Sequence, residues 1–580
     1  MSRMNRTQSR AGIRTCLAAA GSLAAGLLVP MDAVAAFDGS LFTPSGNYLA
    51  ARLAGKTRDN VKAAEFYGRA LRSDPNNRVI LERTFLLELS SGHTEKAERL
   101  AKRVVAKDAR NRLARVVLGL MEYKAGRHQE ARAHWEAASH GPIGELTAAL
   151  LTGWSHAAQG NTDQALVSLE KLSRTESFGI YRVFHAAMIA DLGDQTEKAR
   201  NLYENAYKSA GSSLRVVQAY GNFLERNGQA DKAQEIYATY AKAANQHLLI
   251  SQVLKNSKAG QVPARMIPNA QDGAAEALFG LASALADESG LDFAIIYSQL
   301  TLDLKPLFPI ALTLLGDIYE DAKLYDKAIE IYRRIPHTSP LRENAEIQIA
   351  LDLNQLDRLE DARETLTRLI EESPDRHQPA LTLANILRGH SKFDEASGFY
   401  SKAIDLLPEI KDHHWTVFYF RGICYERSKQ WPKAEADFVK ALELRPDQPL
   451  VLNYLGYSWV EKRHNLDEAI RMIRKAVELR PNDGYIVDSL GWAHYQLKQF
   501  DDAVVELERA VELRPDDPVI NDHLGDAYWN VGRKIEAKFQ WSHARDLDPE
   551  PENLDIILRK LEHGLLNEKA SNETGQPDKS

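Results

Sequence analysis

Residues 484–517 read GYIVDSLGWAHYQLKQFDDAVVELERAVELRPDD, and residues 518–551 repeat the pattern as PVINDHLGDAYWNVGRKIEAKFQWSHARDLDPEP. In the first copy, small residues stand at places 8, 20 and 27, larger apolar residues at places 4, 7 and 24, and proline at place 32. These residues are Gly491, Ala503, Ala510, Val487, Leu490, Leu507 and Pro515. Antiparallel helices approach closely where side chains are small, and proline ends the second helix. The stretch therefore predicts a stacked helix-turn-helix unit.

The alanine at place 20 extends this unit along the chain. It recurs at intervals of 34 residues, with one break and a few small insertions. The fourteen copies are Ala63, Ala97, Ala131, Ala165, Ala199, Ala233, Ala294, Ala328, Ala362, Ala396, Ala434, Ala469, Ala503 and Ala537. A period in this range indicates a solenoid whose units bury their apolar faces against their neighbours. We predict an all-α solenoid of about 14 units, with its function on an extended surface.

These places resemble the tetratricopeptide repeat (TPR), and the resemblance implies a right-handed superhelix. A closer resemblance covers about 100 residues at the C-terminal end. The segments Asn453-Tyr-Leu-Gly-Tyr457, Asp488-Ser-Leu-Gly-Trp492 and Asp522-His-Leu-Gly-Asp526, with Trp529 and Trp541, are similar to those of a group of exported bacterial TPR proteins. That resemblance implies an envelope scaffold or an adaptor that brings cell-wall hydrolases to a carboxyl-terminal processing protease. The chain departs from lipoprotein members of the group because it lacks a lipid-accepting cysteine.

The N-terminal segment, residues 1–36, has the pattern of a secretory signal. Arg3, Arg6, Arg10 and Arg14 precede an apolar stretch, and small residues follow up to Ala36. We predict cleavage after Ala35 or Ala36 and a periplasmic protein, with outer-membrane association left open. An uncleaved membrane anchor is the alternative, but the apolar run is short for a span. No later segment is apolar enough to cross a bilayer.

The remaining chain divides into five predicted regions. An N-terminal array of about six degenerate units covers 37–245, and an array of about eight covers 274–549. Between them, residues 246–273 contain Gly260, Pro263, Pro268 and Gly273, which interrupt the period. We read this segment as a hinge between two arrays, with a degenerate repeat as the alternative. A capping helix is predicted over 550–566 and a disordered tail over 567–580.

Composition and motifs exclude several function classes. Cleavage would move the formal charge from −7 to about −10, which disfavours nucleic acid as a partner. Cys424 would be the lone cysteine of the mature chain, without disulfide or thiolate metal site, and we expect it to be buried. The triplet Asp412-His413-His414 has no accompanying strand pattern for a metal site. Without a nucleophile elbow, phosphate loop or zinc helix, we predict no enzyme, cofactor or metal.

The resemblance to TPR stacks implies that places 2, 5, 9 and 12 of each first helix face a concave groove. In the last four units these places combine aromatic rings with short amides or carboxylates, which suits an extended peptide or a helix. The predicted partner-binding residues are Tyr419, Ile423, Asn453, Tyr457, Tyr485, Asp488, Trp492, Tyr495, Asp522, Asp526 and Trp529. Trp492 and Trp529 are the main candidates.

The predicted groove is acidic, because Asp488, Asp522 and Asp526 occupy its places. Such a lining would repel a terminal carboxylate and favour basic or neutral partners. We predict a non-catalytic scaffold or adaptor that binds envelope proteins or peptides. The alternative is an accessory protein in surface polysaccharide export that stacks glycan on the groove aromatics. Oligomeric state is not predicted.

Overall fold

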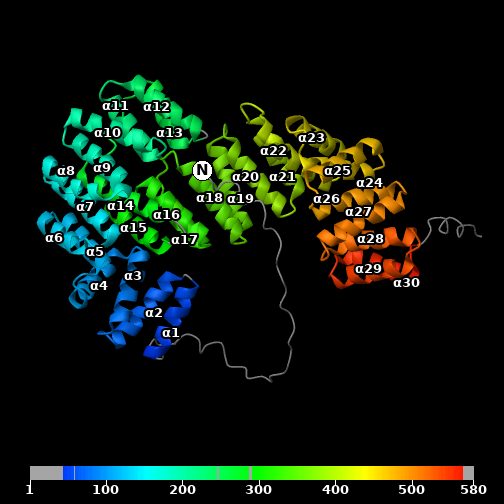
Figure 1. Cartoon of the computed structure of the whole chain (residues 1–580), viewed down its shortest axis with the longest axis horizontal. Helices are drawn as coiled ribbons and strands as arrows, with labels where there is room; N and C mark the ends of the chain where they lie inside the picture. Colours follow the sequence, from blue (N-terminus) through cyan, green and yellow to red (C-terminus); the bar gives the residue numbers. More distant parts are fainter. Residues whose placement is uncertain (1–42, 58, 245–246, 287–289, 566–580) are drawn as a thin grey trace, which may run out of the picture. The chain divides into compact units, whose positions relative to one another are not determined.

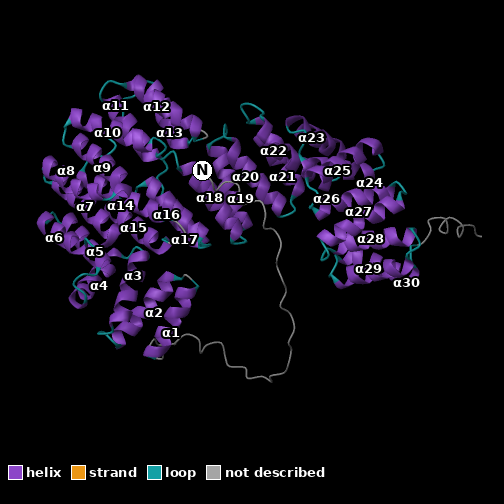
Figure 2. Cartoon of the chain, viewed as in Figure 1, coloured by secondary structure: helices purple, strands orange, loops and turns teal. Residues whose placement is uncertain are grey.

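The computed structural model describes residues 43–57, 59–244, 247–286 and 290–565, and within these ranges all regular structure is helical (Figures 1 and 2). The predicted signal segment and C-terminal tail lie outside the described residues. Thirty α-helices are present in these ranges. None of them is both long and apolar enough to cross a membrane.

Fourteen helix pairs account for most of the described chain, in agreement with the predicted solenoid of about 14 units. The first helices of the pairs are α1 (Pro44–Lys56), α3 (Arg78–Ser90), α5 (Arg112–Lys124), α7 (Gly141–Ala158), α9 (Gly179–Leu192), α11 (Leu214–Arg226), α14 (Ala270–Leu285), α16 (Pro309–Asp321), α18 (Arg342–Gln355), α20 (His377–Gly389), α22 (Trp415–Arg427), α24 (Pro449–Glu461), α26 (Gly484–Gln496) and α28 (Pro518–Asn530). The second helices are α2 (Asn60–Ser73), α4 (Thr94–Lys107), α6 (His128–Ala138), α8 (Thr162–Glu170), α10 (Thr196–Ala210), α12 (Ala230–Ala243), α15 (Leu291–Leu304), α17 (Tyr325–Arg333), α19 (Leu359–Glu372), α21 (Phe393–Asp405), α23 (Trp431–Leu444), α25 (Leu466–Leu479), α27 (Phe500–Leu513) and α29 (Lys534–Asp546).

The other elements are α13 (Leu248–Lys258), α30 (Pro551–His563) and three short 3₁₀ helices, η3 (Lys171–Arg174), η4 (Glu176–Phe178) and η5 (Asp412–His414).

The place-20 alanines lie at the centre of each helix pair. All fourteen have 0% exposure. The small residue at place 8 lies under the large side chain at place 24 of the same unit. A Cβ on Gly491 would lie 2.6 Å from Leu507, and one on Gly525 would lie 2.4 Å from Trp541. The glycines therefore make room for these side chains rather than for the place-20 alanine alone.

The helices form two compact units whose boundary differs from the predicted one. Unit 1 extends to Thr365 and unit 2 begins at Leu366, so the boundary falls within α19. The predicted boundary at 246–273 lies inside unit 1. Both predicted arrays therefore contribute helices to one core.

The segment 246–273 does not act as a hinge between separate arrays. Its first part is α13, which packs against α11 and α12 as a first helix would, but no second helix follows it. The chain instead runs through an irregular stretch to α14, which contacts α7 and α9, and α15 then contacts α3. The loss of the period at this segment marks the point where the chain returns onto its own earlier first helices.

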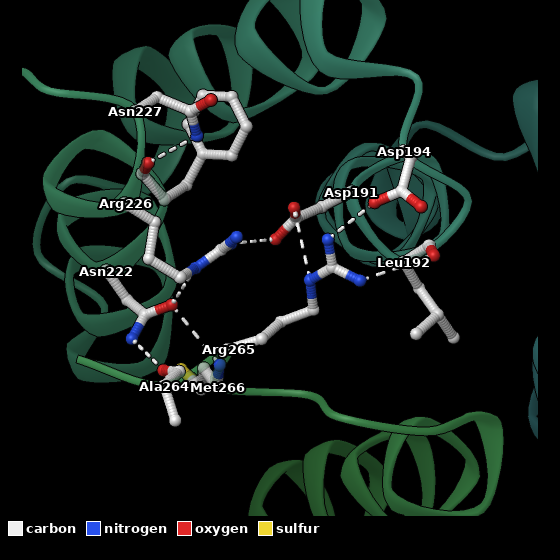
Figure 3. A network of polar contacts seen from close by, with 10 residues as sticks. Asp191, Leu192, Asp194, Asn222, Arg226, Asn227, Ala264, Arg265 and Met266 are labelled. Carbon is white, nitrogen blue, oxygen red and sulfur yellow. Dashed lines mark hydrogen bonds and ion pairs between the residues drawn. The ribbon is translucent and has the colours of Figure 1, made fainter. Parts of the chain in front are cut away.

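A polar network fixes this return (Figure 3). Arg265 of the irregular stretch donates to Asp194, at 2.7 Å, and pairs with Asp191 at the end of α9. Asn222 of α11 donates to the Ala264 carbonyl, at 2.8 Å, and accepts from the Met266 amide, at 3.2 Å. These hydrogen bonds and ion pairs tie the irregular stretch to α9 and α11.

We call α14, α15 and α16 the returning helices, since their buried contacts join them to the first helices of unit 1. A Cβ on Gly273 would lie 2.2 Å from the ring of Trp154 in α7, so only glycine permits this approach. Thr147 and Tyr297 are joined by a hydrogen bond of 3.1 Å between their hydroxyls.

A buried ion pair adds to these contacts. Arg215 of α11 binds both carboxylate oxygens of Glu276 in α14, at 2.8 and 2.5 Å. The Glu276 side chain is only 2% exposed. The first-helix side of α3, α7, α9 and α11 is therefore occupied by the same chain.

Unit 2 continues as a simple stack. Consecutive pairs contact each other, and α26 also contacts α24 and α28, so the first helices lie side by side. The helix α30 lies within the range predicted for the cap and packs against α29. Ile557 is its buried residue, whereas Leu558 is 45% exposed.

Candidate functional site

The predicted partner-binding residues of unit 2 lie on first helices α22, α24, α26 and α28. They do not form one uniform surface. Tyr419, Asp488 and Asp526 are buried, at 9%, 7% and 5% exposure, so the interpretation of these three as surface contacts is wrong. The other predicted residues are partly or fully exposed, namely Ile423, Asn453, Tyr457, Tyr485, Trp492, Tyr495, Asp522 and Trp529.

Three stacked rings form the most ordered part of the site. The Trp492 ring lies between Tyr495, with centroids 4.6 Å apart, and His523, with centroids 3.9 Å apart. The interplanar angles are 8° and 15°. We call these three residues the ring column. Trp492 and Tyr495 remain half-buried, so the column presents rings that are already ordered.

Hydrogen bonds hold the ring column at both ends. Asp488 Oδ1 lies 2.9 Å from His523 Nδ1, and Trp492 Nε1 donates to Glu461, at 3.2 Å. Tyr495 accepts from Asn530, at 3.1 Å. Burial alone would lower the pKa of His523, but Asp488, helped by Asp522 and Asp526, raises it overall. A protonated His523 beside Asp488 is thus favoured.

The last unit is closed by α30. Lys560 donates to both Asp522, at 2.8 Å, and Asp526, at 2.8 Å. Burial raises the pKa of Asp526 to about 6, although Lys560 opposes this shift. With Asp488 on His523, all three groove carboxylates have partners within the chain. The expectation of a freely acidic groove that selects basic partners is therefore not supported by the geometry.

Trp529 is also part of this closure. A Cβ on Gly564, just after α30, would lie 2.1 Å from the Trp529 ring, and that ring lies 5.3 Å from Trp541. Gly564 has a positive φ of 72°, which suits glycine. Trp529 therefore supports the C-terminal cap, whereas Trp492 belongs to the ring column.

The two remaining predicted tyrosines at the start of α22 and α26 differ in burial. Tyr419 lies in an aromatic cluster with Trp415, Phe438 and Tyr454, with centroid distances of about 6 Å. Tyr485 lies on the surface, half exposed, with the Arg514 guanidinium 4.8 Å from its ring centre.

The groups that organise the site were missing from the sequence prediction. His523, Glu461 and Lys560 stand outside the places assigned to the groove. Asp488 and His523 are 35 residues apart and Asp522 and Lys560 are 38 apart, close to one period. A search for acidic and basic residues about one period apart could have found these pairs, because first helices of successive units are neighbours.

The structure also bears on metal binding and on the reactivity of the Cys424 thiol. In the described part of the chain, no group of three or more His, Cys, Asp or Glu side chains could hold a metal ion. Cys424 is buried, as expected, and burial raises its thiol pKa to about 12. Such a thiol is a poor nucleophile at neutral pH.

Family models for the tetratricopeptide repeat match segments of both units. The matched segments are 83–142, 147–175, 291–342, 415–448 and 491–532. The segments 83–142 and 147–175 include parts of α3 and α7, two of the first helices that the returning helices cover. The repeat is thus recognised by sequence in the degenerate half as well.

Two curated relatives share part of the chain. Tetratricopeptide repeat protein 13 of Homo sapiens is 27% identical over 212 residues, which are 35% of this chain and 22% of that protein. A TPR repeat-containing protein of Pseudomonas aeruginosa is 25% identical over 183 residues, 31% of this chain and 30% of that protein. The chain spans less than a third of the length of either relative.

Solved structures with a similar succession of helices include the Cut9–Hcn1 hetero-tetramer of APC/C and yeast Tom70. Cut9–Hcn1 is 14% identical, with 90% of this chain and 97% of that chain covered and a TM-score of 0.35. Tom70 is 12% identical, with 90% and 95% covered and a TM-score of 0.32.

Proposed function

We propose that this chain, a tetratricopeptide repeat protein, is a non-catalytic scaffold of the bacterial cell envelope that binds other proteins or extended peptides through unit 2. The ring column is the observation that carries this proposal. Its rings are stacked, hydrogen-bonded and half-buried, so binding a partner would cost little additional ordering. Aromatic residues of this kind dominate the energetics of many protein interfaces.

The binding surface we propose is narrower than the set of groove places. It comprises Trp492 and Tyr495, with Tyr457 and Tyr485 on the same succession of first helices. Asp488 and His523 would act beneath it, by fixing the orientation of Trp492. Asp526 and Trp529 would hold the cap.

The envelope location rests on the N-terminal segment 1–36 alone. Arginines, an apolar run and small residues there support export to the periplasm and cleavage after Ala35 or Ala36. The resemblance of the segments ending at Tyr457, Trp492 and Asp526 supports an adaptor for cell-wall hydrolase or protease complexes.

Affinity capture from envelope extract tests the scaffold function. The mature full-length chain carrying Trp492→Ala should lose at least about tenfold of its main captured protein, the effect of removing one aromatic hot spot. Phe539→Ala is the matched control, because it removes a ring that is 66% exposed on α29, away from the column. Equal capture by the wild-type chain and the Trp492→Ala chain would contradict the proposal.

A second candidate function is glycan binding in surface polysaccharide export. The half-buried rings of Trp492 and Tyr495 favour it, because sugars also bind to accessible aromatic side chains. Titration of purified surface polysaccharide into the mature chain separates the two functions. Saturable binding that Trp492→Ala abolishes, with no protein captured, would replace the scaffold by the glycan-binding function.

A further inference from the structure

The return of the chain in unit 1 leaves one large opening uncovered. Helices α1, α2 and α3 on one side, and α15 with the turn between α16 and α17 on the other, border a cleft of about 860 Å³, which we call the N-terminal cleft. Its floor is apolar and includes Leu86, Leu87, Ile295 and Ile296. Two large apolar side chains at its border, Val79 and Phe293, are 59% and 38% exposed. A cleft of this size accepts several side chains of a partner.

One rim of the cleft is basic. Arg52 of α1 and Arg83 of α3 line it, and both side chains are exposed. Among the described residues, neither guanidinium makes a hydrogen bond or an ion pair. By contrast, Arg78 on the same α3 is bound by both Glu82 and Asp108. Two arginines without acidic neighbours leave a local positive field over an apolar floor.

Tyr67 lines the same cleft as the two arginines and gives a second indication of a ligand. It is 93% buried, yet lines the cleft, and its hydroxyl has no hydrogen-bond partner among the described residues. Both Arg52 and Arg83 act on it electrostatically. Tyr48 packs edge-on against its ring, with centroids 5.8 Å apart. Two guanidinium groups and a phenolic donor thus converge where an acceptor with negative charge would be bound.

The opposite rim carries a carboxylate. Asp292 of α15 lines the cleft and is exposed beside Phe293. Its charge repels other carboxylates from the α15 side. A negatively charged ligand would therefore place its acidic groups at the rim formed by α1 and α3.

We infer that the N-terminal cleft is a second interaction site, which binds an acidic protein segment carrying a large apolar side chain. The apolar side chain enters between Leu86 and Ile296, and carboxylates of the segment bind Arg52, Arg83 and the Tyr67 hydroxyl. This site takes its charge from two arginines, whereas the groove carboxylates of unit 2 are paired within the chain. It does not depend on the ring column.

Selection from a library of random peptides tests this inference directly, with about twelve residues per peptide to span the cleft. The mature full-length chain is the bait. Selected peptides should be net acidic with one large apolar residue, and their affinity should fall at least about tenfold in an Arg52→Ala, Arg83→Ala double variant. Raising the salt concentration should weaken binding to the wild-type chain more than to the double variant.

The control is Arg72→Ala, which removes an exposed arginine of α2 that does not line the cleft and should leave affinity unchanged. A second variant, Phe293→Ser, should also weaken the peptides, and Trp492→Ala should not, which separates this site from the proposed function. Basic or neutral selected peptides, no selected peptide, or acidic peptides insensitive to the double variant would each overturn the inference. So would self-association through Arg52 and Arg83 in light scattering, or selection only after residues 1–42 are removed.

Discussion

Unit 1 and unit 2 are built from the same helix pair, yet they use their first helices differently. In unit 1 the returning helices cover the first helices, and contacts join residues 150 to 229 positions apart, such as Thr147 with Tyr297 and Ser90 with Tyr319. In unit 2 the corresponding contacts join neighbouring pairs, 31 to 38 residues apart.

This difference bears on stability and on binding. A stack with only neighbour contacts behaves as a one-dimensional array, in which a local change has a local effect. Long-range contacts instead make helices depend on distant ones. Unit 1 should therefore unfold as one cooperative core, and unit 2 as a stack whose end opens separately.

The largest expected effect comes from the buried pair that joins α11 to α14. Arg215→Ala would leave Glu276 buried without its cation, which costs about 3–5 kcal/mol. Native-state hydrogen exchange should show lost protection from α3 to α16. Arg471→Ala, which removes one member of an exposed pair with Glu468, should change little. Loss confined to α11 and α14 would contradict a cooperative unit 1.

The next largest effect is on how stability changes with pH, which should have opposite signs in the two units. His185, buried and accepting from Trp154 at 3.1 Å, has its pKa lowered by burial to about 4. Its folded pKa lies below the unfolded value near 6.5. The free energy of unfolding of unit 1 should therefore fall by about 3 kcal/mol as the pH falls from about 6.5 to about 4. His185→Gln should remove that loss.

His523 in unit 2 should behave in reverse. Its pKa is raised, so the stability it contributes is present below the unfolded value and lost as pH rises through the folded one. Hydrogen exchange of the His185→Gln and His523→Gln variants, corrected for the intrinsic effect of pH, measures both. For each variant, the stability of its unit relative to the wild-type chain is followed against pH. If both differences changed with pH in the same direction, the contrast between the units would be refuted.

A smaller and local effect is expected at the C-terminal cap. Lys560→Met keeps the apolar stem but removes the cation from Asp522 and Asp526, at a cost of about 2 kcal/mol. Protection should fall in α28 to α30 and remain unchanged in α22 and α24. Lys538→Met, a control that changes an exposed lysine of α29, should leave the cap in place. Loss of protection throughout unit 2 would show that the stack is more cooperative than its contacts indicate.

The smallest effect concerns Cys424, whose labelling needs no mutation. Because the thiol is buried with a pKa of about 12, a thiol reagent should label it only when α22 opens. Rapid labelling in the folded protein, measured by mass spectrometry, would show that this part of unit 2 opens more readily than its packing implies.

The repeated pairs could be predicted because each one buries the same alanine, as Ala63 and Ala537 do at opposite ends of the ladder. The return of the chain could not, since Arg215 and Glu276 are 61 residues apart and share no periodic place. Gly273 appeared as a helix breaker, whereas it lies inside α14 and accommodates Trp154. At the site, we assumed that places 2, 5, 9 and 12 of each first helix face the groove. This assumption selected the half-buried Trp492, but it also assigned the buried Asp488 and Asp526 to the surface, because it ignores ionic partners one unit away.

The carbonyl of Ser90 accepts hydrogen bonds from Gln299 and Tyr319, which follow it by 209 and 229 residues. During synthesis, α1 to α12 are therefore made well before the helices that complete their packing. Until α16 emerges, the early helices expose a long unfilled face, on which chaperones or incorrect segments can bind. The order in which the chain is made thus places the slowest folding step in the middle of the sequence.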